Sequence, residues 1–328
     1  MTKVLLLLMF WRPLAIVLLG ILVAACGSSS GSDQARWLED TSAPLPARLS
    51  QVGIYADLGS RKAHEDMLPY VPKHPLYSNG LAKERYIHLA EGMNIDVGGD
   101  GWVFPVGTVL VKTFLDGDAP VETRLIFRTV QGWDYALYRW LPDATDAEQL
   151  EGNWAEVTVT LGDGERRHTL PSRLDCRTCH ETHENVAGAP VLGISNLQTD
   201  IDLVDAGVFS QAPSLASVEG RTEDETAALG YFVGNCISCH NGGDSINSVF
   251  SLYPDEAVDN TVGEPTQSET GEGIRVVPGD PGQSVLYITV VEAGNPGYRG
   301  PFKWMPPIGV NTTDEHAEGI LRDWIEGL

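Results

Sequence analysis

The cysteines constrain the structure of this chain more than any other feature. Four of the five fall in two pentapeptides, Cys176-Arg177-Thr178-Cys179-His180 and Cys236-Ile237-Ser238-Cys239-His240. Both read Cys-x-x-Cys-His, the pattern through which haem c is attached to protein. Two thiols three positions apart reach the two vinyl groups on one edge of a porphyrin, and the following histidine supplies the proximal nitrogen to iron. The pattern predicts two covalent haems c, on Cys176, Cys179, Cys236 and Cys239, with His180 and His240 as iron ligands.

Two other uses of these cysteines stay open. Four thiolates bind zinc tetrahedrally, although the two pairs here lie further apart in the chain than is usual for zinc. Two disulfides would also use the four thiols in an oxidising compartment. Neither alternative requires a histidine directly after each second cysteine, so the pattern favours haem.

The start of the chain is typical of an export signal. Residues 1–25 carry the basic Lys3 near their start, continue as an apolar run and end in small residues. Their end, Leu22-Val23-Ala24-Ala25-Cys26, resembles the lipobox of bacterial lipoproteins, in which the signal is removed and the cysteine is lipidated. We therefore expect lipidation at Cys26 and a flexible tether over residues 26–44. An uncleaved transmembrane helix is the alternative.

The residue after Cys26 bears on the compartment. Gly27 takes the place where lipoproteins retained at the inner membrane of Gram-negative bacteria tend to carry Asp. The resemblance therefore implies an anchor in the outer membrane, with the body of the protein in the periplasm.

The formal net charge of −23 describes a strongly acidic chain. Such a surface repels nucleic acid and anionic lipid, so we expect no nucleic-acid partner and contact with the membrane only through the lipid anchor. It attracts basic surfaces, so we expect other redox proteins, with basic surfaces, as partners.

Residues 45–170 are predicted to form a β-rich domain. Runs of β-branched, aromatic and alternating residues predict strands, and short polar turns separate them. Antiparallel strands joined in this way favour a sandwich or a small barrel. The expected strands are Glu84–Leu89, Trp102–Phe114, Val121–Val130, Trp133–Trp140 and Trp154–Leu161.

The remainder of the chain is predicted to be mostly α-helical. We expect a first haem segment over residues 171–221 and a second haem domain over residues 222–328. Thr222–Asn235 has acidic residues in its first turn and an apolar stripe, as a helix does. Residues 313–325 predict a final helix, with Thr313 as its cap.

Residues 222–328 resemble the small monohaem cytochrome c fold, in which a helix before the haem motif crosses a C-terminal helix. Gly230 and Trp324 are the residues expected at that crossing. The resemblance also implies an iron ligand from a proline-flanked loop, here Trp304-Met305-Pro306-Pro307. We therefore expect Met305 to be the sixth ligand of the second iron, which raises its reduction potential and closes it to other ligands.

The sixth ligand of the first iron stays open. The chain has no methionine between Met93 and Met305, so the segment that follows the first motif supplies no methionine ligand. An open sixth position would make this iron reactive. The upstream candidates are Met67, Met93, His64, His74, His88 and His168.

The segment Phe104–Lys112 resembles part of the cytochromes with a lysine-cross-linked haem that oxidise hydroxylamine, which also place a β domain ahead of one Cys-x-x-Cys-His motif. Lys112 is the candidate for the cross-linking lysine. The simpler interpretation, which we prefer from the residue type, is an exposed lysine on a strand.

From Pro75 to its C-terminal helix the chain resembles a family of bacterial dihaem c-type cytochrome lipoproteins, with the two motifs and Met305 as the most specific points. The resemblance implies an α+β fold, with a β-rich domain followed by mostly helical cytochrome c segments, and electron transfer through two haems. The alternative is a haem enzyme that acts on peroxide or hydroxylamine at an open first haem, with the second as relay. A third hypothesis is an assembly protein with structural haems.

Overall fold

The computed structural model describes residues 36–99, 101–162, 164, 166–181, 191–243 and 250–328. The expected signal sequence, Cys26 and the start of the tether lie outside the described residues. Within the described part, no helix combines the length and the apolar character needed to cross a membrane. Residues 36–328 form one unit, which contains all three segments expected after the tether.

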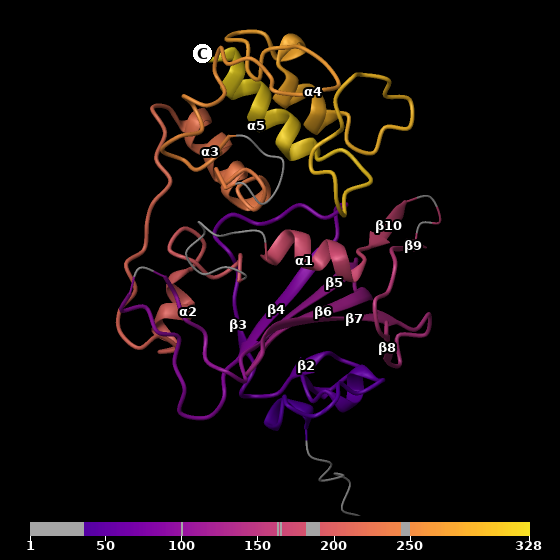
Figure 1. Cartoon of the computed structure of the whole chain (residues 1–328). Coiled ribbons are helices and arrows are strands. Elements are labelled where there is room, and N and C mark those ends of the chain that lie inside the picture. The colour runs from indigo at the N-terminus through magenta and orange to yellow at the C-terminus, as the bar shows by residue number, and fades with distance from the viewer. Residues whose placement is uncertain (1–35, 100, 163, 165, 182–190, 244–249) are drawn as a thin grey trace, which may run out of the picture. The chain divides into compact units, whose positions relative to one another are not determined.

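Six strands form the main sheet, in the order β3-β4-β5-β6-β7-β8, and each is antiparallel to its neighbours (Figure 1). Strands β1 and β2, and strands β9 and β10, pair in two small separate sheets. The strands are β1 (Tyr55–Asp57), β2 (Lys62–Ala63), β3 (Leu68–Pro69), β4 (Ala82–His88), β5 (Val109–Asp116), β6 (Ala119–Thr129), β7 (Gly132–Trp140), β8 (Ala147–Gln149), β9 (Val157–Thr160) and β10 (Arg167–Leu170).

The order of the strands corrects the expectation of a sandwich or barrel. Among the described residues the main sheet follows the chain strand by strand, with β3 and β8 at its edges. The expected strand over Trp102–Phe114 begins only at Val109. Pro105 has no N–H to donate, and Gly107 has a φ of +89°, so this part of the chain turns before β5 begins.

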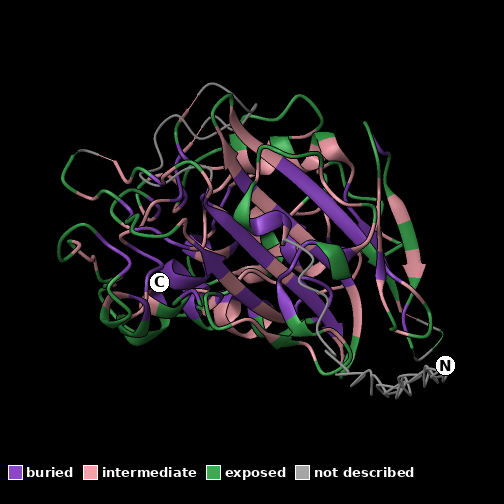
Figure 2. Cartoon of the chain, turned by 90° about the horizontal axis from the view of Figure 1, so that it is seen from below, coloured by how far each residue is buried: buried purple, intermediate pink, exposed green. Residues whose placement is uncertain are grey.

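The two faces of the sheet have different surroundings. Buried stretches run along the strands (Figure 2). On one face Val109, Val111 and Leu125 pack in an apolar core with Trp37 and Tyr138. The opposite face carries the alternate residues of the same strands. Part of it joins a second apolar cluster, and the middle of it lines the cavity described below.

The helices follow the main sheet in the chain. Helices α3 and α5 pack together, and the rings of Phe232 and Trp324 meet edge to face at 5.6 Å. The helices are α1 (Arg173–Glu181), α2 (Ile201–Asp205), α3 (Glu223–Asn235), α4 (Val285–Val291) and α5 (Glu315–Glu326), with single turns of 3-10 helix at Trp37–Glu39, Leu49–Gln51 and Pro281–Gln283.

Two details of this helical part differ from expectation. Asp314, not Thr313, caps α5, because its carboxylate accepts from the backbone N–H of His316 and Ala317. The hydroxyl of Thr313 donates instead to the carbonyl of Val291, at 2.8 Å. Gly230 does not face α5: a Cβ there would come within 2.7 Å of the His74 ring, so this glycine makes room for His74.

The fold is therefore α+β, with antiparallel strands in the N-terminal part of the described chain and most of the helical residues after them.

Candidate functional site

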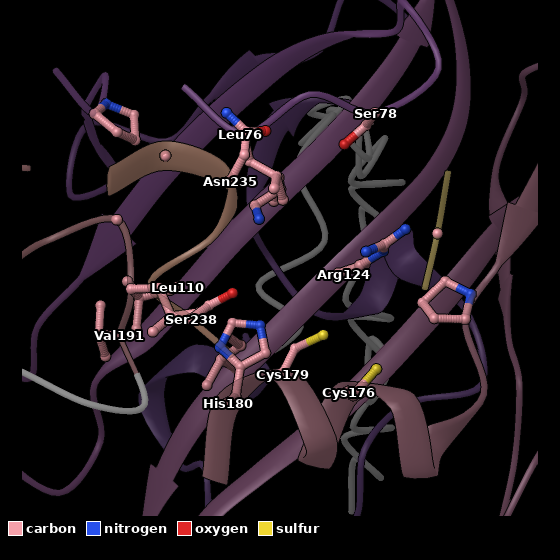
Figure 3. Close-up of a pocket in the computed structure, with 18 of the residues that line it drawn as sticks. Leu76, Ser78, Leu110, Arg124, Cys176, Cys179, His180, Val191, Asn235 and Ser238 are labelled. Carbon is pink, nitrogen blue, oxygen red and sulfur yellow. The ribbon is translucent and has the colours of Figure 1, made fainter. Parts of the chain in front are cut away.

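Helix α1 presents the first motif to a cavity. Positions 176, 179 and 180 are three and four residues apart, so the two thiols and the imidazole lie on one face of the helix. All three residues line the cavity, together with residues of the sheet (Figure 3). At the start of the helix, the Asp175 carboxylate accepts from the backbone N–H and the hydroxyl of Ser172.

Contacts with β7 fix the position of α1. Arg173 pairs with Asp134 and donates to the carbonyl of Tyr135 at 3.0 Å. The ring of Tyr135 lies 5.8 Å from the ring of His180. The entry to the helix is also held, because the Trp154 indole N–H donates to the carbonyl of Pro171 at 2.8 Å.

The second motif begins where α3 ends. The chain turns tightly there, because the backbone N–H groups of Cys239 and His240 both donate to the carbonyl of Cys236, at 2.9 and 2.8 Å. Ser238 and Cys239 line the same cavity as the first motif. Cys236 packs against the apolar cluster around α3 and α5 instead. The structure therefore brings parts of both motifs to one cavity.

Burial sets the state of the thiols. It raises the pKa of Cys176 to about 11 and that of Cys236 to about 12. Burial, followed by the nearby Cys239, raises the pKa of Cys179 to about 12. The thiols are therefore protonated near neutral pH. None of the four is in a disulfide, and within the described part of the chain no three His, Cys, Asp or Glu side chains are grouped to hold a metal ion.

His240 is a half-buried, neutral imidazole. Burial and the neighbouring Arg275 lower its pKa to about 4. Its ring lies 4.5 Å from the Phe250 ring, and the Arg275 guanidinium covers the same phenyl ring at 4.1 Å. A neutral imidazole keeps the lone pair that a metal ligand requires.

Met305 lies next to the part of the structure that holds the second motif. Its side chain packs against the apolar cluster that also receives Cys236 and Phe250. Its backbone N–H donates to the carbonyl of Thr289 at 2.9 Å. The residues that follow it, 306–308, line the cavity together with Cys239.

His74 is the one upstream ligand candidate that lines the cavity. Its backbone is held by the Gln198 side chain, which accepts from its N–H at 2.9 Å and donates to its carbonyl at 3.0 Å. Burial lowers the pKa of His74. The other five candidates, Met67, Met93, His64, His88 and His168, are all described residues and none of them lines the cavity.

The cavity wall contains a lysine that we expected to be exposed. Lys112 lines the cavity, so the interpretation as an exposed strand lysine is wrong. Burial, together with the cations of Arg85, Arg124 and Lys83, holds its pKa well below the usual range.

A buried polar network lies beside the cavity, and the sequence did not predict it. Glu122 and His168 are fully buried, and their side chains meet at 2.8 Å. Arg124 pairs with the same carboxylate. Asn79 donates to the other ring nitrogen of His168 at 3.0 Å, and its side-chain oxygen accepts from the N–H of Asn311 at 2.6 Å. With its proton on Nε2, the imidazole satisfies both partners.

One signal for this network was present in the sequence. Glu122, Arg124 and Arg128 alternate with apolar residues on β6, which normally indicates a solvent-exposed face. Glu122 is fully buried on this strand, so its carboxylate had to find partners inside the protein, which are Arg124 and His168.

Comparison with models of protein families, with curated proteins and with solved structures finds no match to this chain.

Proposed function

We propose that this protein binds two haems c and transfers electrons through them. The observation that carries the proposal is the meeting of two Cys-x-x-Cys-His motifs at one cavity, with Cys176, Cys179, His180 and Cys239 in its lining. Haems attached at these motifs would lie near each other, and electron exchange between the haems is the property a dihaem carrier needs.

The residues present fit haem c. Each motif has two thiols that are not in disulfides and a histidine directly after them. The thiols are protonated, the form whose S–H adds across a vinyl group to give a thioether. His180 and His240 are the iron ligands, and the iron supplies a one-electron couple when the group is bound. The chain contributes the orientation of that group and a buried environment around it.

We assign Met305 to the second iron. It packs against the same apolar cluster as Cys236 and Phe250, and the next three residues line the cavity. A thioether ligand raises the reduction potential and leaves the iron no open position. This fits a carrier of electrons rather than a site of chemistry on a substrate.

A haem enzyme is the second candidate function, and one observation favours it. Tyr135 and Lys112, which have a hydroxyl and an ammonium group, line the cavity beside the first motif. An open first iron near these groups would act on a small substrate such as peroxide or hydroxylamine. His74 decides between the two functions: with His74 as sixth ligand the first iron is closed, and without it the iron is open.

The proposed location is the cell envelope. Lipidation at Cys26 would attach the protein to the membrane, and the body would face the periplasm, where c-type haem is attached. The net charge of −23 suits a redox partner with a basic surface.

The test is haem content measured on the full chain expressed with c-type haem maturation. Intact mass and a pyridine haemochrome spectrum are expected to give two haems per chain. Replacing Cys176 and Cys179 by Ser, or Cys236 and Cys239 by Ser, is expected to remove one haem each. Thr178→Ala, which changes the first motif without touching a thiol, is the control. One haem or none in the unaltered protein contradicts the proposal.

A further inference from the structure

Three cations form a row across the sheet face that lines the cavity. Arg85 on β4 is the register partner of Lys112 on β5, and Lys112 is the register partner of Arg124 on β6. Residues that are directly opposite on neighbouring strands point to the same face. All three line the cavity. The row is unusual because like charges directly opposite each other destabilise a sheet.

Only one of the three cations has a carboxylate partner in the described part of the chain. Arg124 pairs with Glu122. Arg85 is 9% exposed, and its guanidinium makes no hydrogen bond or ion pair with a described residue. The Lys112 ammonium has the Phe114 ring at 5.8 Å as a neighbour, and likewise makes no hydrogen bond to a described residue.

Asp175 is the one acidic residue among the described residues that line the cavity, and its carboxylate already has hydrogen-bond donors. Asp175 accepts two hydrogen bonds from Ser172 at the start of α1. Arg85 and Lys112 therefore face the cavity as two basic groups without a carboxylate partner among the described residues, in a protein whose net charge is −23. Burying a charge without a partner is expensive, so the arrangement calls for two negative charges inside the cavity.

The row has a direction relative to the first motif. Helix α1 packs on β7, and the order of the sheet then runs to Arg124, Lys112 and Arg85 on successive strands. Arg124 lies beside both thiols of the motif, as Figure 3 shows. Strands are about 4.8 Å apart, so Arg85 is two spacings, about 10 Å, further from that motif. The unpaired cations are therefore on the side of the cavity away from Cys176 and Cys179.

We infer that Arg85 and Lys112 bind the two propionate carboxylates of the haem attached to Cys176 and Cys179. The inference rests on the proposed function. The propionates leave the porphyrin on the edge opposite the vinyl groups, and the row of cations runs away from the thiols in that direction. Two carboxylates match the two cations without a partner. A free oxyanion has the same chemistry, and the experiment separates the two sources.

The experiment measures two properties of the haem-loaded full chain. The first is the midpoint potential of each haem by spectropotentiometry, and the second is the binding of sulfate by calorimetry. The variants are Lys112→Met, Arg85→Gln and the charge-retaining Lys112→Arg. Lys62→Met removes an exposed positive charge from β2 and is the control. Intact mass is measured first and establishes that the first motif carries haem. If it carries none, the proposed function is contradicted before any variant is measured.

Loss of a cation beside the propionates favours the oxidised haem. Lys112→Met and Arg85→Gln are each expected to shift the reduction equilibrium of the first haem about tenfold toward the oxidised form, which is 59 mV for one electron. Lys112→Arg and the control Lys62→Met are expected to keep the reduction potential of the first haem at the value of the unaltered protein. The unaltered protein is expected to bind no sulfate. If Lys112→Met fails to fold, Arg85→Gln and Lys112→Arg still decide the result.

Three results overturn the inference. In the first, the unaltered holoprotein binds sulfate, Lys112→Met abolishes that binding, and the reduction potentials do not change. The cations would then bind a free anion and not the propionates. In the second, neither the potentials nor sulfate binding responds to any variant. In the third, the first motif carries no haem, and sulfate binding to that protein then shows whether the cations bind anions at all.

Discussion

Cys179 of the first motif and Cys239 of the second line one cavity, and Cys239 is close enough to help raise the pKa of Cys179. The two motifs are carried by different elements, α1 and the turn after α3, which are far apart in the chain. Their convergence is the structural basis for the proposal that two haems exchange electrons directly.

Met305→Ala is expected to open the second iron. Without the thioether, the reduction potential of that haem falls, and carbon monoxide binds to its reduced form. Met93→Ala is the control, because Met93 is 49% exposed and lies in a different part of the chain. Spectropotentiometry and carbon monoxide difference spectra make the measurement. A Met305→Ala protein with an unchanged potential would rule out this ligand.

His74→Ala is expected to change the spin state of the first iron. With His74 as sixth ligand, electron paramagnetic resonance of the oxidised protein shows a low-spin bis-histidine signal, and the variant converts it to high spin. His64→Ala is the control, since His64 does not line the cavity. A high-spin first iron in the unaltered protein, with no further change in the variant, supports the enzyme instead.

Glu122→Gln is expected to remove a part of the stability that depends on pH. Burial works to raise the pKa of Glu122, but the Arg124 cation and the His168 hydrogen bond outweigh it, so the pKa lies below its usual value. A carboxyl with a lowered folded pKa stabilises the fold above its unfolded pKa, about 4.3. That contribution is lost as the pH falls through the folded pKa.

The measurement is denaturant unfolding of both proteins between pH 3 and pH 7. Breaking a buried pair by removing one partner costs about 3–5 kcal/mol, so the variant is less stable at pH 7 and the difference narrows in acid. Glu148→Gln is the control, because its ion pair with Arg48 is about 40% exposed and contributes little. An equal loss at every pH would exclude the linkage.

Asn79→Ala is expected to loosen the loop that follows Met305. The Asn79 amide donates to the Gly309 carbonyl at 3.2 Å, and its oxygen accepts from the N–H of Asn311. Deleting these bonds, together with the one to the buried His168 ring, leaves polar groups unsatisfied, at about 1–3 kcal/mol. The φ of Asn79 is +53°, so alanine adds backbone strain of about 1–2 kcal/mol.

Asn79→Gly separates the two effects, because glycine keeps the positive φ without strain and still deletes the amide. Thermal unfolding is expected to rank the unaltered protein first, Asn79→Gly second and Asn79→Ala last. Hydrogen exchange at Asn311 is expected to rise in both variants. Slow exchange at Asn311 in either variant would show that the amide does not hold this loop.

Local patterns predicted local structure well. The alternation in Val121–Val130 predicted β6, the aromatic residues of Trp133–Trp140 predicted β7, and the pattern in Thr222–Asn235 predicted α3. These elements depend on the period of their own apolar residues, which a single stretch of sequence contains. The prediction of one strand over Trp102–Phe114 was wrong. It relied on the β-branched and aromatic residues of this stretch and overlooked the turn that Pro105 and Gly107 form.

The sequence by itself determined the two Cys-x-x-Cys-His motifs and the α+β order of the chain, because both depend only on residues that are close together in the chain. Only the tertiary structure decided that the motifs share a cavity, that His74 reaches it and that Arg85 and Lys112 face it. Which residues meet across a sheet depends on strand register, and which elements meet depends on the burial of apolar faces. Both are set by packing between segments far apart in the chain, so no single stretch of the sequence contains them.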